Sequence, residues 1–201
     1  MAQVFTELNE RLITFIASQP MFFVATAPCL DRSGAGGHVN VSPKGYRDTF
    51  VVLDPLTVAY LDLTGSGAET IAHLRQNGRI TIMFCSFARE PKILRLHGAG
   101  DVIVPDDQRW EEFVARFPAS GLGTGTDRGQ RRAIIVVNIE RIADSCGYAV
   151  PRMDLVTERD LLDRWAERQS PEGLVTYRAE RNSMSIDGLP ALAVGTAGDR
   201  K

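Results

Sequence analysis

Two neighbouring stretches of the chain carry side chains that could hold an anion. The first is VNVSPKG at residues 39–45, which offers Asn40, Ser42 and Lys44 from one short extended run. A lysine ammonium is a compact positive charge that suits a phosphate, and it stands here beside an amide and a hydroxyl. This stretch predicts a binding site for a group of about phosphate size.

The second stretch is the turn TGSGAET at residues 64–70, which links a β-type run to a short helical pattern. Ser66 and Glu69 have the spacing of a capping box, which predicts a helix start near Gly67. Free backbone N–H groups at such a start lie at the positive end of the helix dipole and attract anions. An ordinary capped helix has the same pattern, and the upstream lysine is what favours the anion site.

Other candidate residues carry weaker signals. Arg95 alternates with apolar neighbours in LRLHG, so it faces either solvent or a cofactor groove. Cys146 has no activating neighbour and is expected to be packed rather than reactive. The histidines lack ligand spacing, so no metal site is predicted; they are His38, His73 and His97.

A cluster of three arginines precedes the last β-type run. Arg128, Arg131 and Arg132 follow a glycine-rich stretch, and a solvated loop is favoured over an anion clamp. The sequence has no GxSxG, HExxH, Walker or GxGxxG pattern. The sequence therefore excludes most classes of hydrolase, protease, NTPase and dinucleotide-binding fold. No catalytic residue is assigned.

The composition is that of an ordinary globular protein. Of 201 residues, 44% are hydrophobic and 24% charged, and the net charge of −2 leaves no broad basic face for a nucleic acid. Three widely spaced cysteines indicate neither a disulfide framework nor zinc, and favour a reducing, cytoplasmic location. Residues 1–20 are expected to form an amphipathic helix, not a signal peptide or membrane span.

Short apolar runs separated by turn residues predict a barrel or a strongly curled antiparallel sheet. After Pro105 a helix is expected to pack over a barrel opening, and after Cys146 a helix over residues 157–168, capped by Thr157, is followed by loop. The expected divisions are residues 1–20, 21–145 and 146–201. The expected strands are MFFVATA, HVNVS, TFVVLD, TVAYLDL, RITIMFCSF, ILRLHGAGDVIV (bent at its glycines) and AIIVVNIERI.

The order of these segments resembles a known family. VNVSPKG, then VAYLDLTGSGAETIAHLRQNGRITIMF, then KILRLHGAGDVI, are similar to the FMN-binding split β-barrel of the pyridoxamine 5′-phosphate oxidase-like superfamily, over roughly residues 20–145. SCGYAVP and NSMSIDGLP resemble the endings of a branch of uncharacterised, predicted flavin-nucleotide-binding members. The resemblance implies a mainly β fold with flanking helices, and a homodimer with FMN at the subunit interface. The residues it implies at the cofactor are Asn40, Ser42, Lys44, Thr64, Ser66, Glu69, Thr70 and Arg95.

The sequence departs from the true oxidase where that enzyme holds its ligands. Gly67-Ala68 stand where the oxidase has an Arg-Lys pair, and Ile93 stands where it has a glutamine. The oxidase's C-terminal tryptophan and Arg-Leu-His segment have no counterpart. Pyridoxamine phosphate is therefore not the expected substrate. The leading hypothesis is an FMN-dependent oxidoreductase acting on a small molecule; the alternatives are a deazaflavin- or haem-binding barrel and a flavin-binding sensor without turnover.

Overall fold

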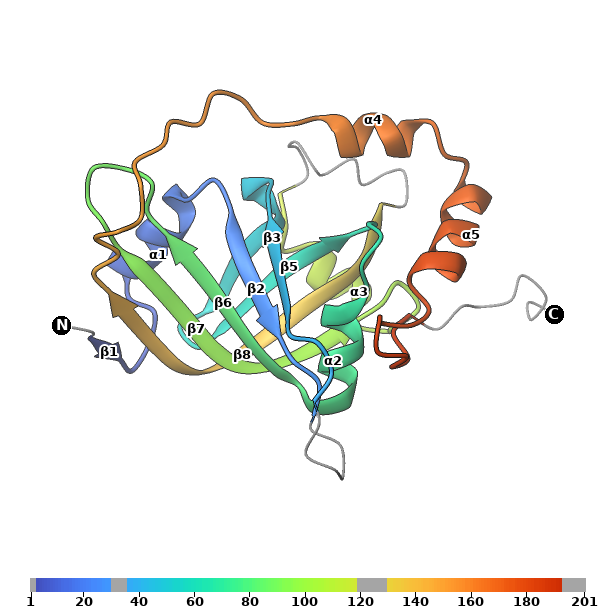
Figure 1. Ribbon diagram of the computed structural model, residues 1–201, viewed down its shortest axis with the longest axis horizontal. Coiled ribbons are helices and arrows are strands. Elements are labelled where there is room, and N and C mark those ends of the chain that lie inside the picture. Colours follow the sequence, from blue (N-terminus) through green and yellow to red (C-terminus); the bar gives the residue numbers. More distant parts are fainter. Residues whose placement is uncertain (1–2, 30–35, 119–129, 193–201) are drawn as a thin grey trace.

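One curled antiparallel sheet dominates the computed structural model, which describes residues 3–29, 36–118 and 130–192 (Figure 1). Within these residues the strand order is β3-β2-β6-β7-β8-β5-β4, and the short β1 pairs with β8 outside this path. The mainly β class with flanking helices is confirmed. The strands are β1 (Val4–Phe5), β2 (Phe22–Thr26), β3 (Asn40–Lys44), β4 (Phe50–Asp54), β5 (Thr57–Leu63), β6 (Arg79–Cys85), β7 (Ile93–Ile103) and β8 (Arg131–Ser145).

Strand alternation gives the sheet an apolar inner face and a second, smaller apolar patch outside. Inner-face residues such as Val24, Ile82 and Leu96 lie opposite one another across β2, β6 and β7, and all are buried. The helix α1 (Glu10–Ser18) and the C-terminal residues Ala191 and Leu192 contribute to the same core. The ends of the chain's described part are thus tied to the barrel.

The N-terminal helix is shorter than predicted. Asn9 caps the helix by accepting a hydrogen bond from the Leu12 amide at 3.1 Å, and the helix ends at Ser18, with Gln19 as its C-cap before Pro20. Upstream of the cap, β1 pairs with β8. The expectation of one helix over residues 1–20 is wrong because Val4 and Phe5 form a strand and the asparagine cap starts the helix only at Glu10.

The helix after Pro105 also differs from the expectation. Only α3 (Trp110–Val114) is α-helical there, and its Phe113 packs on a patch that includes Leu61 and Ile134. These residues face the opposite side of β5 and β8 from the inner core. Thus α3 covers the outer wall of the sheet and does not close an opening of the barrel.

The glycine bend predicted in β7 is confirmed. The register between β7 and β8 shifts between His97 and Gly98, which is a β-bulge. A Cβ atom at Gly98 would lie 2.0 Å from the carbonyl oxygen of Asn138, so no other residue allows this approach of the two strands. The bulge curls the sheet around its core.

The segment after β8 runs along one side of the barrel and carries two helices, α4 (Leu161–Glu167) and α5 (Pro171–Arg181) (Figure 1). Thr157 does not cap α4, whose N-cap is Asp160 without a side-chain hydrogen bond. The loop expected after residue 168 is wrong: Ser170 caps α5 and Pro171 takes its first position, a signal present in the sequence. No helix in the described ranges is long and apolar enough to cross a membrane.

Candidate functional site

The three polar residues of VNVSPKG point to the inner side of the barrel. In the β2–β3 pair, Asn40, Ser42 and Lys44 lie directly opposite Thr26, Val24 and Phe22. Residues opposite each other in an antiparallel pair share a face, and Val24 and Phe22 belong to the core. β3 therefore delivers an amide, a hydroxyl and an ammonium to one edge of the barrel interior.

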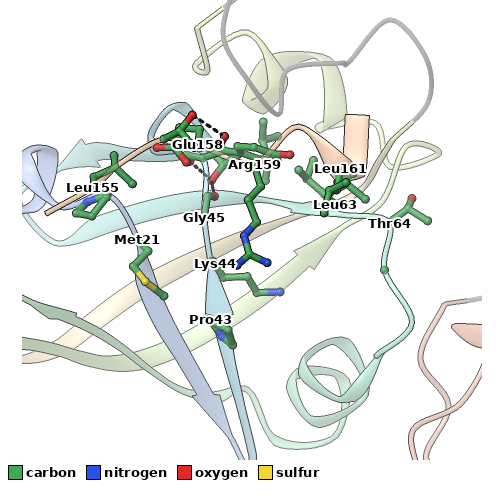
Figure 2. A pocket seen from close by; sticks show the side chains of 17 residues that line it. Met21, Pro43, Lys44, Gly45, Leu63, Thr64, Leu155, Glu158, Arg159 and Leu161 are labelled. Carbon is green, nitrogen blue, oxygen red and sulfur yellow. Dashed lines mark hydrogen bonds between the residues drawn. The ribbon is translucent and has the colours of Figure 1, made fainter. Parts of the chain in front are cut away.

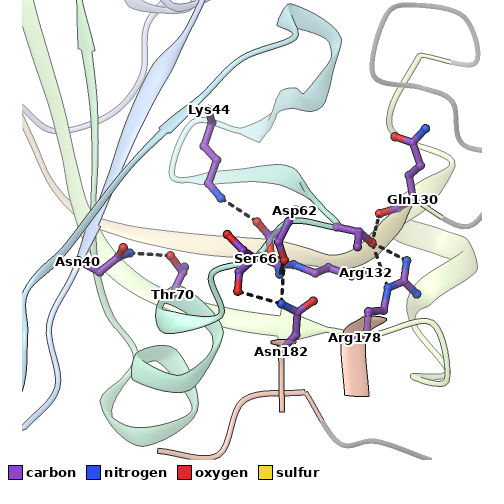
Figure 3. A network of polar contacts seen from close by, with 11 residues as sticks. Asn40, Lys44, Asp62, Ser66, Thr70, Gln130, Arg132, Arg178 and Asn182 are labelled. Carbon is purple, nitrogen blue, oxygen red and sulfur yellow. Dashed lines mark hydrogen bonds and ion pairs between the residues drawn. The ribbon is translucent and has the colours of Figure 1, made fainter. Parts of the chain in front are cut away.

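A chain of hydrogen bonds joins β3 to the helix α2 (Glu69–Asn77) (Figure 3). Asn40 Nδ2 donates to Thr70 Oγ1 at 3.0 Å, and Ser42 Oγ donates to Asn40 Oδ1 at 3.1 Å. Thr26 Oγ1 lies 3.0 Å from Nδ1 of the fully buried His73. Burial of His73 lowers the pKa of its ring, which keeps the imidazole neutral.

The Lys44 ammonium is held by a carboxylate that the sequence did not single out. Lys44 Nζ lies 2.8 Å from Asp62 Oδ1, and Arg132 Nε lies 2.8 Å from Asp62 Oδ2 (Figure 3). The exposed fractions of the side chains are 20% for Lys44, 0% for Asp62 and 5% for Arg132. Burial alone would raise the pKa of Asp62, but Arg132 and Lys44 together lower it to about 2. Asp62 is therefore ionised and both cations are paired.

A β-bulge brings Arg132 inside. In the β5–β8 pair Asp62 lies opposite Ala133 and Leu63 lies opposite Arg131, so Arg132 is the extra residue. Its guanidinium turns to Asp62 and also donates to the Gly65 carbonyl at 3.0 Å. The solvated-loop expectation is wrong for Arg131 and Arg132, which lie in β8, and Arg128 is outside the described residues.

The turn before α2 does not form the predicted capping box. The helix begins at Glu69 with Ala68 as N-cap and without a side-chain cap, and the Ser66 side chain is exposed. The Glu69 carboxylate instead folds back beside Gly67, 2.8 Å from where a Cβ atom would stand there. A negative group thus already lies at the helix start where an anion was expected.

The C-terminal segment, which lies outside the barrel strands, makes hydrogen bonds to the turn before α2. Arg178 donates to Thr64 Oγ1 at 2.7 Å, and Asn182 Nδ2 donates to the Gly65 carbonyl at 2.8 Å. Thr64 also donates to the Gln130 carbonyl at 2.8 Å, so its hydroxyl is fully used. These contacts make residues 178–182 part of the site's framework.

Two cavities meet at Lys44. A polar pocket of about 150 Å³ is lined by Ser42, Lys44, Glu69, Thr70 and Arg132 together with Leu63, Gly65 and Gly67; we call it the head pocket. A larger cavity of about 570 Å³ adjoins it, and Lys44, Leu63 and Gly65 line both spaces. We call it the ring cavity.

The ring cavity is mainly apolar and is covered by the C-terminal segment (Figure 2). Its walls include Met21, Pro43 and Leu63 from the barrel side, and Leu155 and Leu161 from the segment leading into α4. Its volume is within the range of about 300–1,000 Å³ that is usual for small-molecule sites. A flat organic ligand of moderate size would fit between the barrel and this cover.

Tyr46 and Arg159 add polar groups to the ring cavity. Tyr46 adopts φ 61°, a strained conformation for a non-glycine residue, and burial together with Asp163 raises the pKa of its hydroxyl to about 12. The Arg159 side chain points into the cavity toward Lys44 (Figure 2), and it makes no hydrogen bond or ion pair with the residues described. The cavity therefore holds a hydroxyl that is hydrogen-bonded to Asp163 and a cation that has no partner among the described residues.

Arg95 lies apart from the other candidate residues. It pairs with Met83 and shares the outer face of β7 with His97, whereas Leu94 and Leu96 face the core. Its guanidinium donates to Ser145 Oγ at 3.1 Å. Within one protomer Arg95 lines neither the head pocket nor the ring cavity, and its predicted contact with a cofactor stays a prediction.

The family model for pyridoxamine 5′-phosphate oxidase matches residues 8–146, and this range contains every strand of the barrel except β1. The chain belongs to this family. The family protein ustO of Aspergillus flavus is 42% identical over 202 residues, covering 94% of this chain and 77% of the relative. The resemblance stated from the sequence is confirmed.

Solved structures of similar shape are more distant. A FAD-binding protein of Mesorhizobium loti is 15% identical with a TM-score of 0.45, and the match covers 72% of this chain and 96% of that one. HupZ of Group A Streptococcus is 22% identical with a TM-score of 0.47, covering 67% and 91%. The FAD binding protein of Mycobacterium smegmatis is 13% identical with a TM-score of 0.42, covering 70% and 97%.

The most important residue missed from the sequence is Asp62. In TVAYLDL it alternates with Val58 and Tyr60, which face the core, and an acidic residue on a core face signals a buried partner. Arg178, Asn182 and Tyr46 carry no comparable signal, because they reach the site only through the path of the folded chain.

Proposed function

We propose that this member of the pyridoxamine 5′-phosphate oxidase family is an FMN-binding oxidoreductase that works as a homodimer. One observation carries the proposal: an apolar cavity of about 570 Å³ and a polar pocket of about 150 Å³ adjoin at Lys44. A flavin nucleotide has the same division, since a flat ring system is joined to a polyol ending in phosphate.

The residues present fit such a ligand by their hydrogen-bonding chemistry. The Lys44 ammonium uses one of its three N–H donors on Asp62, and Thr70 Oγ1 accepts from Asn40 while its own O–H is free to donate among the described residues. The amide of Asn40 and the hydroxyl of Ser42 complete the polar side. Lys44, Ser42 and Thr70 would hold the ribityl chain and phosphate, and the ring cavity would hold the flavin ring.

A bound flavin supplies the electron and hydride transfer, and the chain supplies position and environment. The apolar walls around Leu63 and the cover at Leu155 and Leu161 exclude water from a ring placed there. The Tyr46 hydroxyl, which is hydrogen-bonded to Asp163 and has its pKa raised to about 12, stays protonated near neutral pH. We assign no general acid or base.

The homodimer is supported by the outer face of the barrel. Val39 and Val41 are 70% and 62% exposed, and Val41 lies beside the half-buried Ala25 of β2. Arg95 and His97 lie on the outer face of the same sheet. A second copy on this face would bury the apolar residues and would bring Arg95 of one subunit near the cofactor of the other. Light scattering on the purified protein tests this stoichiometry.

Titration of the purified, ligand-free protein tests the cofactor proposal. FMN, FAD, a deazaflavin and haem are added in turn while flavin fluorescence or haem absorption is followed. Leu63→Trp, which fills the wall shared by both cavities, is expected to weaken FMN binding at least tenfold, whereas Leu56→Trp, at a half-exposed leucine outside both cavities, leaves it unchanged. Binding of haem or a deazaflavin in preference to FMN would contradict the proposal.

A further inference from the structure

The head pocket has little net charge, although it contains two cations. Lys44 and Arg132 line it, but both are paired with the carboxylate of Asp62, and a second carboxylate, that of Glu69, lines the pocket directly. Arg178 bonds to the neighbouring Thr64 and does not line the pocket. Among the described residues that line the pocket or form an ion pair with its lining, two positive charges therefore meet two negative charges.

Asp62 cannot turn away to make room for an incoming anion. Its side chain is fully buried, and each carboxylate oxygen accepts a hydrogen bond of 2.8 Å from a different cation. Breaking either contact would leave a buried charge without its partner, which is a severe penalty. A ligand group that enters the head pocket must therefore share Lys44 with Asp62 and approach Glu69, and both contacts disfavour a dianion more than a hydroxyl.

We propose that Asp62 is a specificity-determining residue, which makes the head pocket accept a neutral polyhydroxyl chain and leaves a terminal phosphate to contribute little to binding. This inference rests on the proposed function, since it concerns the end of the same flavin. FMN is then held mainly by its ring and ribityl groups. Riboflavin, which lacks the phosphate, binds the native protein within tenfold of the affinity of FMN.

The direct test compares FMN and riboflavin by fluorescence titration at fixed ionic strength. In the native protein the ratio of the two affinities is expected to be below ten. In Asp62→Asn, which frees both cations without changing the shape of the side chain, the ratio is expected to rise at least tenfold. Asp144→Asn removes an acid from the ion pair with Lys92 at the other end of β8 and is expected to leave the ratio unchanged.

Two further measurements test the inference in case Asp62→Asn does not fold or the native protein does not bind a flavin. Lys44→Gln leaves the neutral Asp62–Arg132 pair intact, and in it riboflavin is expected to bind more tightly than FMN. Inorganic phosphate, against chloride at equal ionic strength, is expected to raise the melting temperature of Asp62→Asn by several degrees and that of the native protein by less than one.

The outcomes separate this inference from the proposed function. If neither flavin binds the native protein, the proposed function fails, and the phosphate-dependent melting comparison alone decides the role of Asp62. A native protein that binds FMN more than tenfold tighter than riboflavin overturns the inference while the proposed function stands. An unchanged affinity ratio in a folded Asp62→Asn protein, or equal stabilisation of both proteins by phosphate, also overturns it.

Discussion

The head pocket and the ring cavity share three residues but are built on opposite principles. The head pocket is made by strands and by α2, and its charges are buried and mutually satisfied around Asp62. The ring cavity is made by one barrel wall and a largely exposed C-terminal segment, and its Arg159 is uncommitted within the described residues. The first space has balanced charges, whereas the second is mainly apolar and contains Arg159, which has no partner among the described residues.

This difference separates two contributions to binding that a flavin nucleotide would combine. In an apolar cavity the binding free energy grows with the apolar area that is removed from water, and a flat ring buries the most area there. In a polar pocket whose charges are already paired, the affinity of a ligand depends more on hydrogen-bond geometry than on its charge. We therefore expect changes in the head pocket to alter the folding stability and ligand selectivity, and changes in the cover of the ring cavity to alter affinity with smaller effects on folding.

The largest effect is expected from Asp62→Ala. This substitution leaves the nearly buried Arg132 and the largely buried Lys44 without their carboxylate, so the free energy of unfolding should fall by about 3–5 kcal/mol. Urea denaturation followed by circular dichroism measures the loss. The control Asp144→Ala, in a pair with Lys92 outside both cavities, should cost about 1 kcal/mol or less; equal losses would contradict the special role of the buried carboxylate.

A smaller loss in the free energy of unfolding is expected when the native protein is acidified. Because the pKa of Asp62 falls to about 2 in the folded state from an ordinary value of 3.8, the unfolded chain binds the proton more readily. The corresponding stability, about 2 kcal/mol, is fully present above about pH 4 and is lost as the pH falls toward 2. Urea denaturation across pH 2–5 should show this loss in the native protein and not in Asp62→Asn.

Loss of the hydrogen bonds between Asn182 and the turn before α2 is expected to lower the free energy of unfolding by a smaller amount. Asn182→Ala deletes the hydrogen bonds to the carbonyls of Gly65 and Ser66, but Arg132 still donates to Gly65. A loss of about 1–2 kcal/mol in unfolding free energy is expected from the lost bonds and the small void. Hydrogen exchange should show faster opening of residues 64–70, while exchange in β6 and β7 stays as in the native protein.

The smallest effect is expected from Tyr46→Phe. Near neutral pH the change should cost about 1 kcal/mol or less, since it removes one hydroxyl from the ring cavity. In the native protein the raised pKa of Tyr46 favours the folded state below pH 10, and this stability is lost as the pH rises toward 12. Chemical denaturation at pH 9–12 should show a shallower alkaline loss in the variant; an identical loss would rule out Tyr46 as its source.

The sequence predicted the elements better than the contacts among them. The extended run predicted for Asn40, Ser42 and Lys44 is β3, and their spacing of two places all three on one face of it, because period-two patterning survives tertiary packing. The capping box at Ser66 and Glu69 failed because capping depends on local dihedral angles, and here tertiary contacts use the Glu69 carboxylate, which accepts from the Ile186 amide at 3.3 Å. Local spacing alone does not contain that information.

The charge balance of the site was the least accessible feature from sequence. Arg132 points inward only because a bulge inserts it between two ladder positions, and a bulge depends on register across a pair separated by about 70 residues. Arg178 and Asn182 arrive through a helix that a serine cap and Pro171 could have revealed. The unremarked acid on the core face of β5 was the one readable sign of the buried ion pairs.

A crystal structure of the protein with FMN would test the central claim most directly. We expect flavin density with the ring between Leu63 and the cover at residues 155–162, and with the ribityl chain passing Lys44 into the head pocket. Flavin density that leaves both spaces empty and lies elsewhere, for example against the outer face at His97, would contradict it.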